Sequence, residues 1–238
     1  MEISLELKKI YKKSIFIGFI WSLIMILILL LSVRNSSQVF YSFIQLIIWP
    51  ILFILVAFFH ELGHASASLD CKIDYNAICL GRREKEKNAI SKSLCKWLLP
   101  NTKVELWMPY FPFNVDYEDS AFENIIAKDF LLILRSGALV GLVMCLSSLI
   151  TITLFLLGAW LFKSVEYNWL FIKDNAVSSI YVVITGAIFQ LINFIPISNK
   201  GKPLSDGAII KRVKEQLKSS GANIDDQRID TGFLKQRT

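Results

Sequence analysis

Four stretches of the chain are apolar and nearly free of charge: residues 15–33, 40–67, 130–162 and 177–197. A helix needs about 20 apolar residues to cross the hydrocarbon core of a bilayer. Glu61 and Arg135 are the only Asp, Glu, Lys or Arg residues within these stretches. Hydrophobic residues make up 54% of the chain, whereas soluble domains average about 45–50%. The sequence therefore predicts an all-α polytopic membrane protein with about four transmembrane helices.

The first stretch follows four lysines, so a cleaved signal peptide is the alternative to a retained anchor. The stretch is longer than the apolar region of a typical signal peptide, and no small-x-small cleavage motif follows it. We expect a retained anchor. The third stretch has 33 residues, and we expect it to form one tilted or kinked span.

The distribution of basic residues predicts the topology. Of the 26 lysines and arginines, 22 lie before the first stretch, between the second and third, or after the fourth. Basic residues accumulate on the cytoplasmic side of membrane proteins. Both termini are therefore expected in the cytoplasm, and the net charge of +6 reflects topology and not nucleic-acid binding. The composition, rich in lysine and isoleucine, suggests the plasma membrane of a bacterium.

The only two histidines, His60 and His64, flank Glu61 near the cytoplasmic end of the second stretch. Residues i and i+4 share one face of a helix, so both imidazoles can bind one metal ion. The glutamate between them can take a proton from water at that metal, as in zinc metalloproteases. The alternative is a chance pattern satisfied within the bundle, but ionisable residues inside a membrane are costly and usually functional.

A catalytic zinc ion usually has three protein ligands, so the two histidines need a partner. The predicted cytoplasmic side offers several glutamates and a set of aspartates that topology alone does not separate: Asp70, Asp74, Asp116, Asp119, Asp129 and Asp206.

These motifs resemble the site-2 protease family of intramembrane zinc metalloproteases. That family pairs His-Glu-x-x-His on one membrane helix with Asn-x-x-Pro and Asp-Gly at a later one. The matching positions here are His60 to His64, Asn193 to Pro196, and Asp206-Gly207. The resemblance covers roughly residues 40–207 and leaves the first apolar stretch outside the shared core.

The resemblance implies a role for each site residue. His60, His64 and Asp206 would bind Zn²⁺, Glu61 would be the general base, and Asn193 would help to hold the substrate or its oxyanion. The chain departs from the family pattern because 13 residues separate Asn193 from Asp206, where about eight are usual. The family's Gly-Pro feature in the middle core helix is also absent, and small residues between 136 and 141 would instead permit close helix packing.

Other interpretations of these residues remain open. Asp206 precedes an apolar stripe and could simply cap a helix. Asn193 could form a hydrogen bond between helices. In a second class of membrane zinc peptidases a glutamate is the third ligand, and Glu215 is the plausible position for it here. A non-catalytic metal-binding or immunity protein is a further alternative.

The segment between the second and third stretches contains two alternating patterns. One runs from Cys71 to Cys79 and the other from Lys103 to Met108. Such alternation predicts β-strands, which would form a small cytoplasmic sheet at the membrane surface. The sheet could hold an extended peptide by strand addition or could form a lid without a substrate role.

The sequence thus predicts a membrane-embedded metalloprotease domain over residues 1–207 and a cytoplasmic tail over residues 208–238 with a short amphipathic helix. The polar part of the tail after Gly221 is expected to be disordered. The expected activity is that of a zinc endopeptidase that cuts a membrane-anchored protein or a small peptide precursor near the cytoplasmic face.

Overall fold

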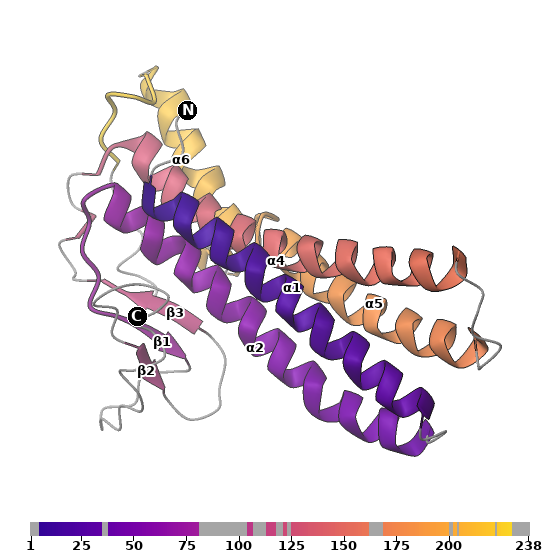
Figure 1. Cartoon of the computed structure of the whole chain (residues 1–238). Coiled ribbons are helices and arrows are strands. Elements are labelled where there is room, and N and C mark those ends of the chain that lie inside the picture. The colour runs from indigo at the N-terminus through magenta and orange to yellow at the C-terminus, as the bar shows by residue number, and fades with distance from the viewer. Residues whose placement is uncertain are drawn as a thin grey trace.

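The computed structural model describes residues 5–34, 38–80, 104–106, 113–117, 121–122, 125–161, 169–199, 202–203, 205–221 and 223–229. Helices dominate this part of the chain (Figure 1). The helices are α1 (Leu5–Arg34), α2 (Gln38–Asp70), α4 (Ala127–Leu161), α5 (Trp169–Ile192) and α6 (Asp206–Ser220). The strands are β1 (Ala77–Leu80), β2 (Val104–Leu106), β3 (Phe113–Asp116), β4 (Ser198–Asn199) and β5 (Lys202–Pro203).

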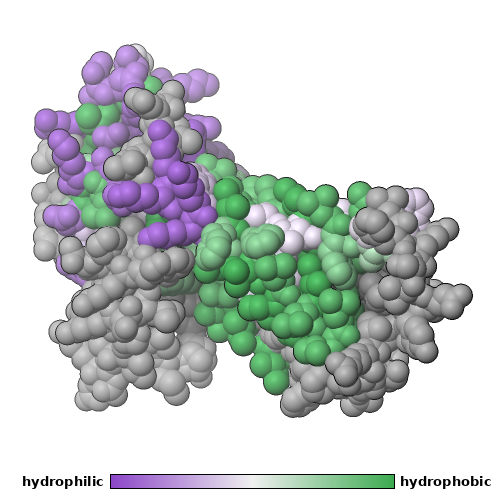
Figure 2. Space-filling model, viewed as in Figure 1, coloured by the Kyte–Doolittle hydropathy of each residue, from purple (hydrophilic) through white to green (hydrophobic). Residues whose placement is uncertain are grey.

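Three helices in the described part of the chain are long and apolar enough to cross a membrane. Their candidate spans are Glu6–Leu31, Pro50–Asp70 and Ala127–Trp160. Hydrophobic side chains cover the surface of this helical region, and hydrophilic ones gather around α6 (Figure 2). The chain is therefore a membrane protein. In α5 the described apolar segment, Ser179–Ile192, is shorter, so the fourth predicted crossing stays a prediction.

The helices approach one another through small residues. A Cβ atom at Gly63 of α2 would lie 2.8 Å from the Cα atom of Gly137 on α4. The Ser14 hydroxyl of α1 donates a hydrogen bond to the Val140 carbonyl of α4 at 2.8 Å. Small side chains let membrane helices pack closely and form hydrogen bonds across their interface. The close packing predicted around residues 136–141 is confirmed.

A small sheet lies beside α2 (Figure 1). Its strand order is β2-β1-β3, with β1 parallel to β2 and antiparallel to β3. Ile78 of β1 and Val115 of β3 are buried in the same core as Phe59 of α2. The predicted sheet is therefore present: β1 overlaps the end of the first alternating segment, and β2 falls within the second.

The first of these strand predictions was partly wrong, because β1 begins at Ala77 and residues 71–76 of the Cys71–Cys79 segment are not a strand. A turn closes α2 instead, with Cys71 N–H donating to the Ala67 carbonyl at 3.1 Å. Lys72 then adopts a left-handed backbone conformation with φ of 58°, which a strand does not allow.

Residues 223–229 form backbone hydrogen bonds with the start of α4, so the prediction of disorder after Gly221 was wrong for these residues. The Ala127 N–H donates to the Gln227 carbonyl at 2.8 Å, and the Ile229 N–H donates to the Ile125 carbonyl at 3.2 Å. These bonds use backbone groups at the start of α4, where a helix leaves N–H groups unpaired. Residues 223–229 thus fasten the chain after α6 to the start of α4.

Candidate metal centre

Helix α2 presents both histidines on one face, as their spacing predicts. The Nε2 atoms of His60 and His64 lie 3.0 Å apart. Both residues are buried, and so is Glu61 between them. They lie in the part of α2 that packs against α4, because Gly63 of the same turn lies against Ser136 and Gly137.

Asp206 completes a group of three donor atoms. Its Oδ2 atom lies 3.3 Å from Nε2 of His60 and 3.3 Å from Nε2 of His64. Among the described residues these three side chains form the group that could hold a metal ion. The structure therefore brings together the three residues that the resemblance implied as ligands.

The start of α6 fixes Asp206 through its two neighbours. Gly207 N–H donates to the Asn193 carbonyl at 2.8 Å, and a Cβ atom at Gly207 would lie 2.8 Å from the Ile195 carbonyl carbon. The Ser205 hydroxyl accepts from Ala208 N–H at 3.2 Å and donates to the Ile195 carbonyl at 2.6 Å. The helix cap is therefore Ser205, so the Asp206 carboxylate is left to face the histidines.

The second ring nitrogen of each histidine has a partner that sets its tautomer. His64 Nδ1 lies 2.7 Å from the Ile133 carbonyl oxygen, which can only accept, so this nitrogen carries the proton. His60 Nδ1 lies 2.7 Å from Oε1 of Gln190, a fully buried residue of α5. Such partners orient metal-binding histidines. With both Nδ1 atoms protonated, both Nε2 lone pairs point toward Asp206.

This arrangement fits a tetrahedral zinc ion. Zinc–nitrogen bonds of about 2.0–2.1 Å place neighbouring ligand atoms about 3.3 Å apart in a tetrahedron. The three observed separations are 3.0, 3.3 and 3.3 Å. Two nitrogen lone pairs and a carboxylate oxygen at these distances repel one another unless a metal ion or a proton lies between them. The donor set, two imidazoles and one carboxylate, is one that zinc accepts.

The charge on Asp206 is stabilised within the site. Burial by itself would raise the pKa of this carboxyl group, but in the metal-free site the positive charge of protonated His64 and His60 outweighs burial and holds the pKa well below its usual range. The Asp206 carboxyl group is therefore anionic at neutral pH.

The alternative third ligand, Glu215, is not part of this group. Its side chain is exposed on α6, 3.9 Å from the Lys211 ammonium. The other expected participant, Asn193, contributes its backbone carbonyl to the site by binding Gly207 N–H. A catalytic role for the Asn193 side chain stays a prediction.

Two supporting residues were missed in the sequence. Gln190 is three residues before Asn193, and its position as the one polar side chain between residues 186 and 192 could have drawn attention to it. Gly137 was noted only as a small residue, yet a Cβ atom there would lie 2.6 Å from Cε1 of His64. Its position opposite His64 depends on how α2 and α4 pack, which no local pattern specifies.

The chain was compared with models of known protein families, with curated proteins and with solved structures. None of the three comparisons gives a match, so the assignment of this site depends on its own geometry.

Proposed function

We propose that this protein is a membrane-embedded zinc endopeptidase of the site-2 protease type. The observation that carries the proposal is the convergence of His60, His64 and Asp206, with Glu61 buried on the same helix turn. A site used only to store or transport a metal has no need of a carboxylate next to its ligands. A hydrolase needs one as a general base.

In the proposed reaction the chain's own residues move one proton. When bound, Zn²⁺ acts as a Lewis acid that acidifies water and polarises the peptide carbonyl. Glu61 accepts the proton that water loses on attacking the carbonyl carbon. The C–N bond then breaks, and Glu61 returns the proton to the leaving amine nitrogen. The products are a carboxylic acid and an amine, and Glu61 is restored.

We further propose that the substrate enters as an extended segment of a membrane-anchored protein or small peptide precursor. A helical peptide bond is shielded by its own turn, whereas an extended one is accessible. Strands β2 and β3 are the edges of the described sheet, and edges can pair with an added strand. The sheet packs on α2 through Ile78 and Val115, next to the turn that bears the histidines.

The orientation is part of the same proposal. Hydrophilic side chains gather at the end of the bundle where α6 lies (Figure 2), and α6 itself carries Lys211, Arg212, Lys214 and Lys218. We place this end in the cytoplasm of a bacterium, with both termini there. The zinc site then lies a short way in from the cytoplasmic face, where water can reach it.

Metal content tests the site. We expect about one zinc ion per chain in the detergent-solubilised protein, lost in His64→Ala and Asp206→Ala and retained in Glu215→Ala. Zinc lost from Glu215→Ala and retained in Asp206→Ala would contradict the ligand assignment. The absence of zinc even after reconstitution would contradict the metal site.

Activity is tested with Glu61→Gln, which keeps the shape of the side chain and removes the base. The probe is fluorescently labelled casein in detergent micelles, with zinc content measured on the same samples. We expect zinc to be retained and cleavage to fall by at least about 100-fold, the scale of general-base catalysis. Equal cleavage by wild type and Glu61→Gln would refute the protease proposal, and so would a zinc-loaded wild type that cleaves nothing.

A further inference from the structure

Tyr117 follows the last residue of β3, and its side chain reaches α2. Its hydroxyl oxygen lies 2.7 Å from the Ser68 hydroxyl oxygen. Ser68 is one turn after His64, and its hydroxyl donates to the His64 carbonyl at 2.9 Å. The strand that forms one edge of the sheet is therefore connected to the metal-binding turn by two consecutive hydrogen bonds.

The direction of these bonds follows from the donors available. Ser68 has a single hydroxyl proton, and the His64 carbonyl can only accept. Ser68 therefore donates to His64 and accepts from Tyr117. The two hydrogen bonds therefore run from the Tyr117 O–H through the Ser68 O–H to the His64 carbonyl. Removing either hydroxyl breaks the connection.

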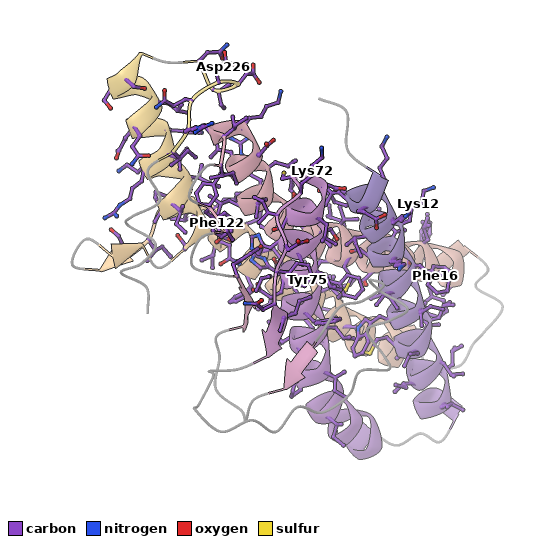
Figure 3. The ribbon with its side chains drawn as sticks, turned by 90° about the vertical axis from the view of Figure 1, so that its left-hand side faces the viewer. Lys12, Phe16, Lys72, Tyr75, Phe122 and Asp226 are labelled. Carbon is purple, nitrogen blue, oxygen red and sulfur yellow. The ribbon has the colours of Figure 1, made fainter. Side chains whose placement is uncertain are left out.

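The ring of Tyr117 is also held in place, by contacts with other aromatic rings. It packs edge-on against Phe122, with ring centroids 4.6 Å apart. Phe122 packs in turn against Phe130 of α4, with centroids 5.4 Å apart. Figure 3 labels Phe122 in this region. The ring contacts therefore connect Tyr117 to α4, the helix that also supplies the Ile133 carbonyl accepting from His64.

The surroundings keep Tyr117 a donor. Burial raises the pKa of its hydroxyl well above the usual value, and the negative charges of Glu61 and Asp206 act in the same direction, whereas the hydrogen bond to Ser68 opposes them. The hydroxyl is therefore neutral at every pH at which the protein would be assayed.

We propose that Tyr117 is a positioning residue that couples the sheet to the zinc site through Ser68 and the His64 carbonyl. A substrate strand paired with the sheet would lie at a fixed distance from the metal. The same hydrogen bonds would fix the position of the His64 imidazole relative to that strand. This inference rests on the proposed metal site and substrate-binding sheet, but its effect on the metal does not require that the protein be a protease.

The test uses Co²⁺ as the probe, because its visible spectrum reports ligand geometry. In the full-length detergent-solubilised protein, Tyr117→Phe keeps the ring and removes the hydroxyl. One hydrogen bond contributes about 0.5–1.5 kcal/mol, so we expect Co²⁺ to bind roughly 2- to 10-fold more weakly, with a shifted absorption band. Tyr181→Phe makes the same change on the exposed face of α5. It should leave the Co²⁺ affinity and the absorption band unchanged.

Ser68→Ala removes the middle hydroxyl of the same series of hydrogen bonds, and it provides a second test if Tyr117→Phe folds poorly. The double variant should bind Co²⁺ no more weakly than the weaker single variant, because both changes remove one connection. Wild-type Co²⁺ affinity and spectrum in both single variants, even with a lowered Tm, would overturn the proposal, and so would fully additive effects. If casein cleavage fails while these Co²⁺ results hold, the proteolytic function alone is refuted.

Discussion

Gly137 of α4 lies against the imidazole of His64 on α2, so closely that a Cβ atom at residue 137 would be 2.6 Å from Cε1 of that ring. Gly137→Ala must therefore displace either the ring or the helix. We expect it to weaken zinc binding at least tenfold and to destabilise the protein by about 1–3 kcal/mol, as overpacking does. Chelator competition and thermal unfolding in detergent measure the two effects.

Gly158 provides the matched control for this change. It lies on the same helix, and a Cβ atom there would meet nothing within 4 Å. Gly158→Ala should leave zinc affinity unchanged. Equal zinc affinity in the Gly137 and Gly158 variants would show that α4 does not set the position of His64.

Gln190 orients His60, and its removal should be felt at the metal. Gln190→Leu leaves the His60 Nδ1–H group buried without its acceptor. Partners of this kind typically change metal affinity by about 10–100-fold, and we expect a loss in that range by chelator competition. Gln190→Glu keeps an acceptor oxygen and should restore most of the affinity. Wild-type binding by the leucine variant would mean that the His60 ring is held by packing alone.

Ser205 is expected to stabilise both α6 and the third ligand. Ser205→Ala removes the helix cap and the bond to the Ile195 carbonyl, and loss of a cap costs about 0.5–2 kcal/mol. We expect a lower Tm in detergent together with weaker zinc binding, since Asp206 is the next residue. Ser219→Ala removes an exposed hydroxyl from the end of the same helix and should change neither. Weaker zinc binding without a lower Tm would contradict the capping role.

Cys71 should resist alkylation. Burial, together with the charges of Asp129 and Asp70, raises the pKa of its thiol to about 12. Below pH 9 the thiolate fraction is then about a thousandfold lower than in an ordinary thiol, and the thiolate is the reactive form. The rate should rise about tenfold for each pH unit between 8 and 11. The alkylation rate is measured by iodoacetamide labelling of a variant in which Cys71 is the only cysteine, with the denatured protein as the reference.

A fast reaction of native Cys71 at pH 8, close to the rate in the denatured protein, would contradict this prediction. It would show that the turn after α2 opens readily, and that the contact between this turn and α4 is weaker than the structure indicates.

The membrane helices and the two histidines could be predicted because their signals are local. Apolar stretches of sufficient length have few alternatives to a membrane helix, and the spacing of His60 and His64 places both on one face of any helix. Burial at membrane depth then leaves few non-functional explanations for the pair.

The remainder of the site depends on contacts between distant segments. Asp206 could be named only through a resemblance, because nothing in its immediate sequence separates a ligand from a helix cap. Ser205 takes the role of the cap, a choice between adjacent residues that depends on the fold of the preceding turn. Tyr117 and Gln190 carry no motif, and their contacts with α2 appear only when the sheet and α5 are packed.

The strand prediction over Cys71–Cys79 failed for a similar reason. Cys71, Ile73 and Tyr75 alternate with polar residues in the sequence. They lie in and just after the turn that closes α2, where the backbone bonds return to α2 and not to a neighbouring strand. An alternating sequence pattern indicates which side chains have apolar surroundings, but it does not indicate which backbone groups their residues bind.

The three donor atoms of the metal centre come from opposite ends of the chain, and this sets the order of its maturation. N-terminal elements emerge first during synthesis, so α2 and its histidines enter the membrane while Asp206 does not yet exist. A partly made chain can offer zinc no more than two of the three ligands. In the proposed peptidase, hydrolytic competence would thus be withheld until α6 has docked, so that a newly made chain would not cut its neighbours while it is still being inserted.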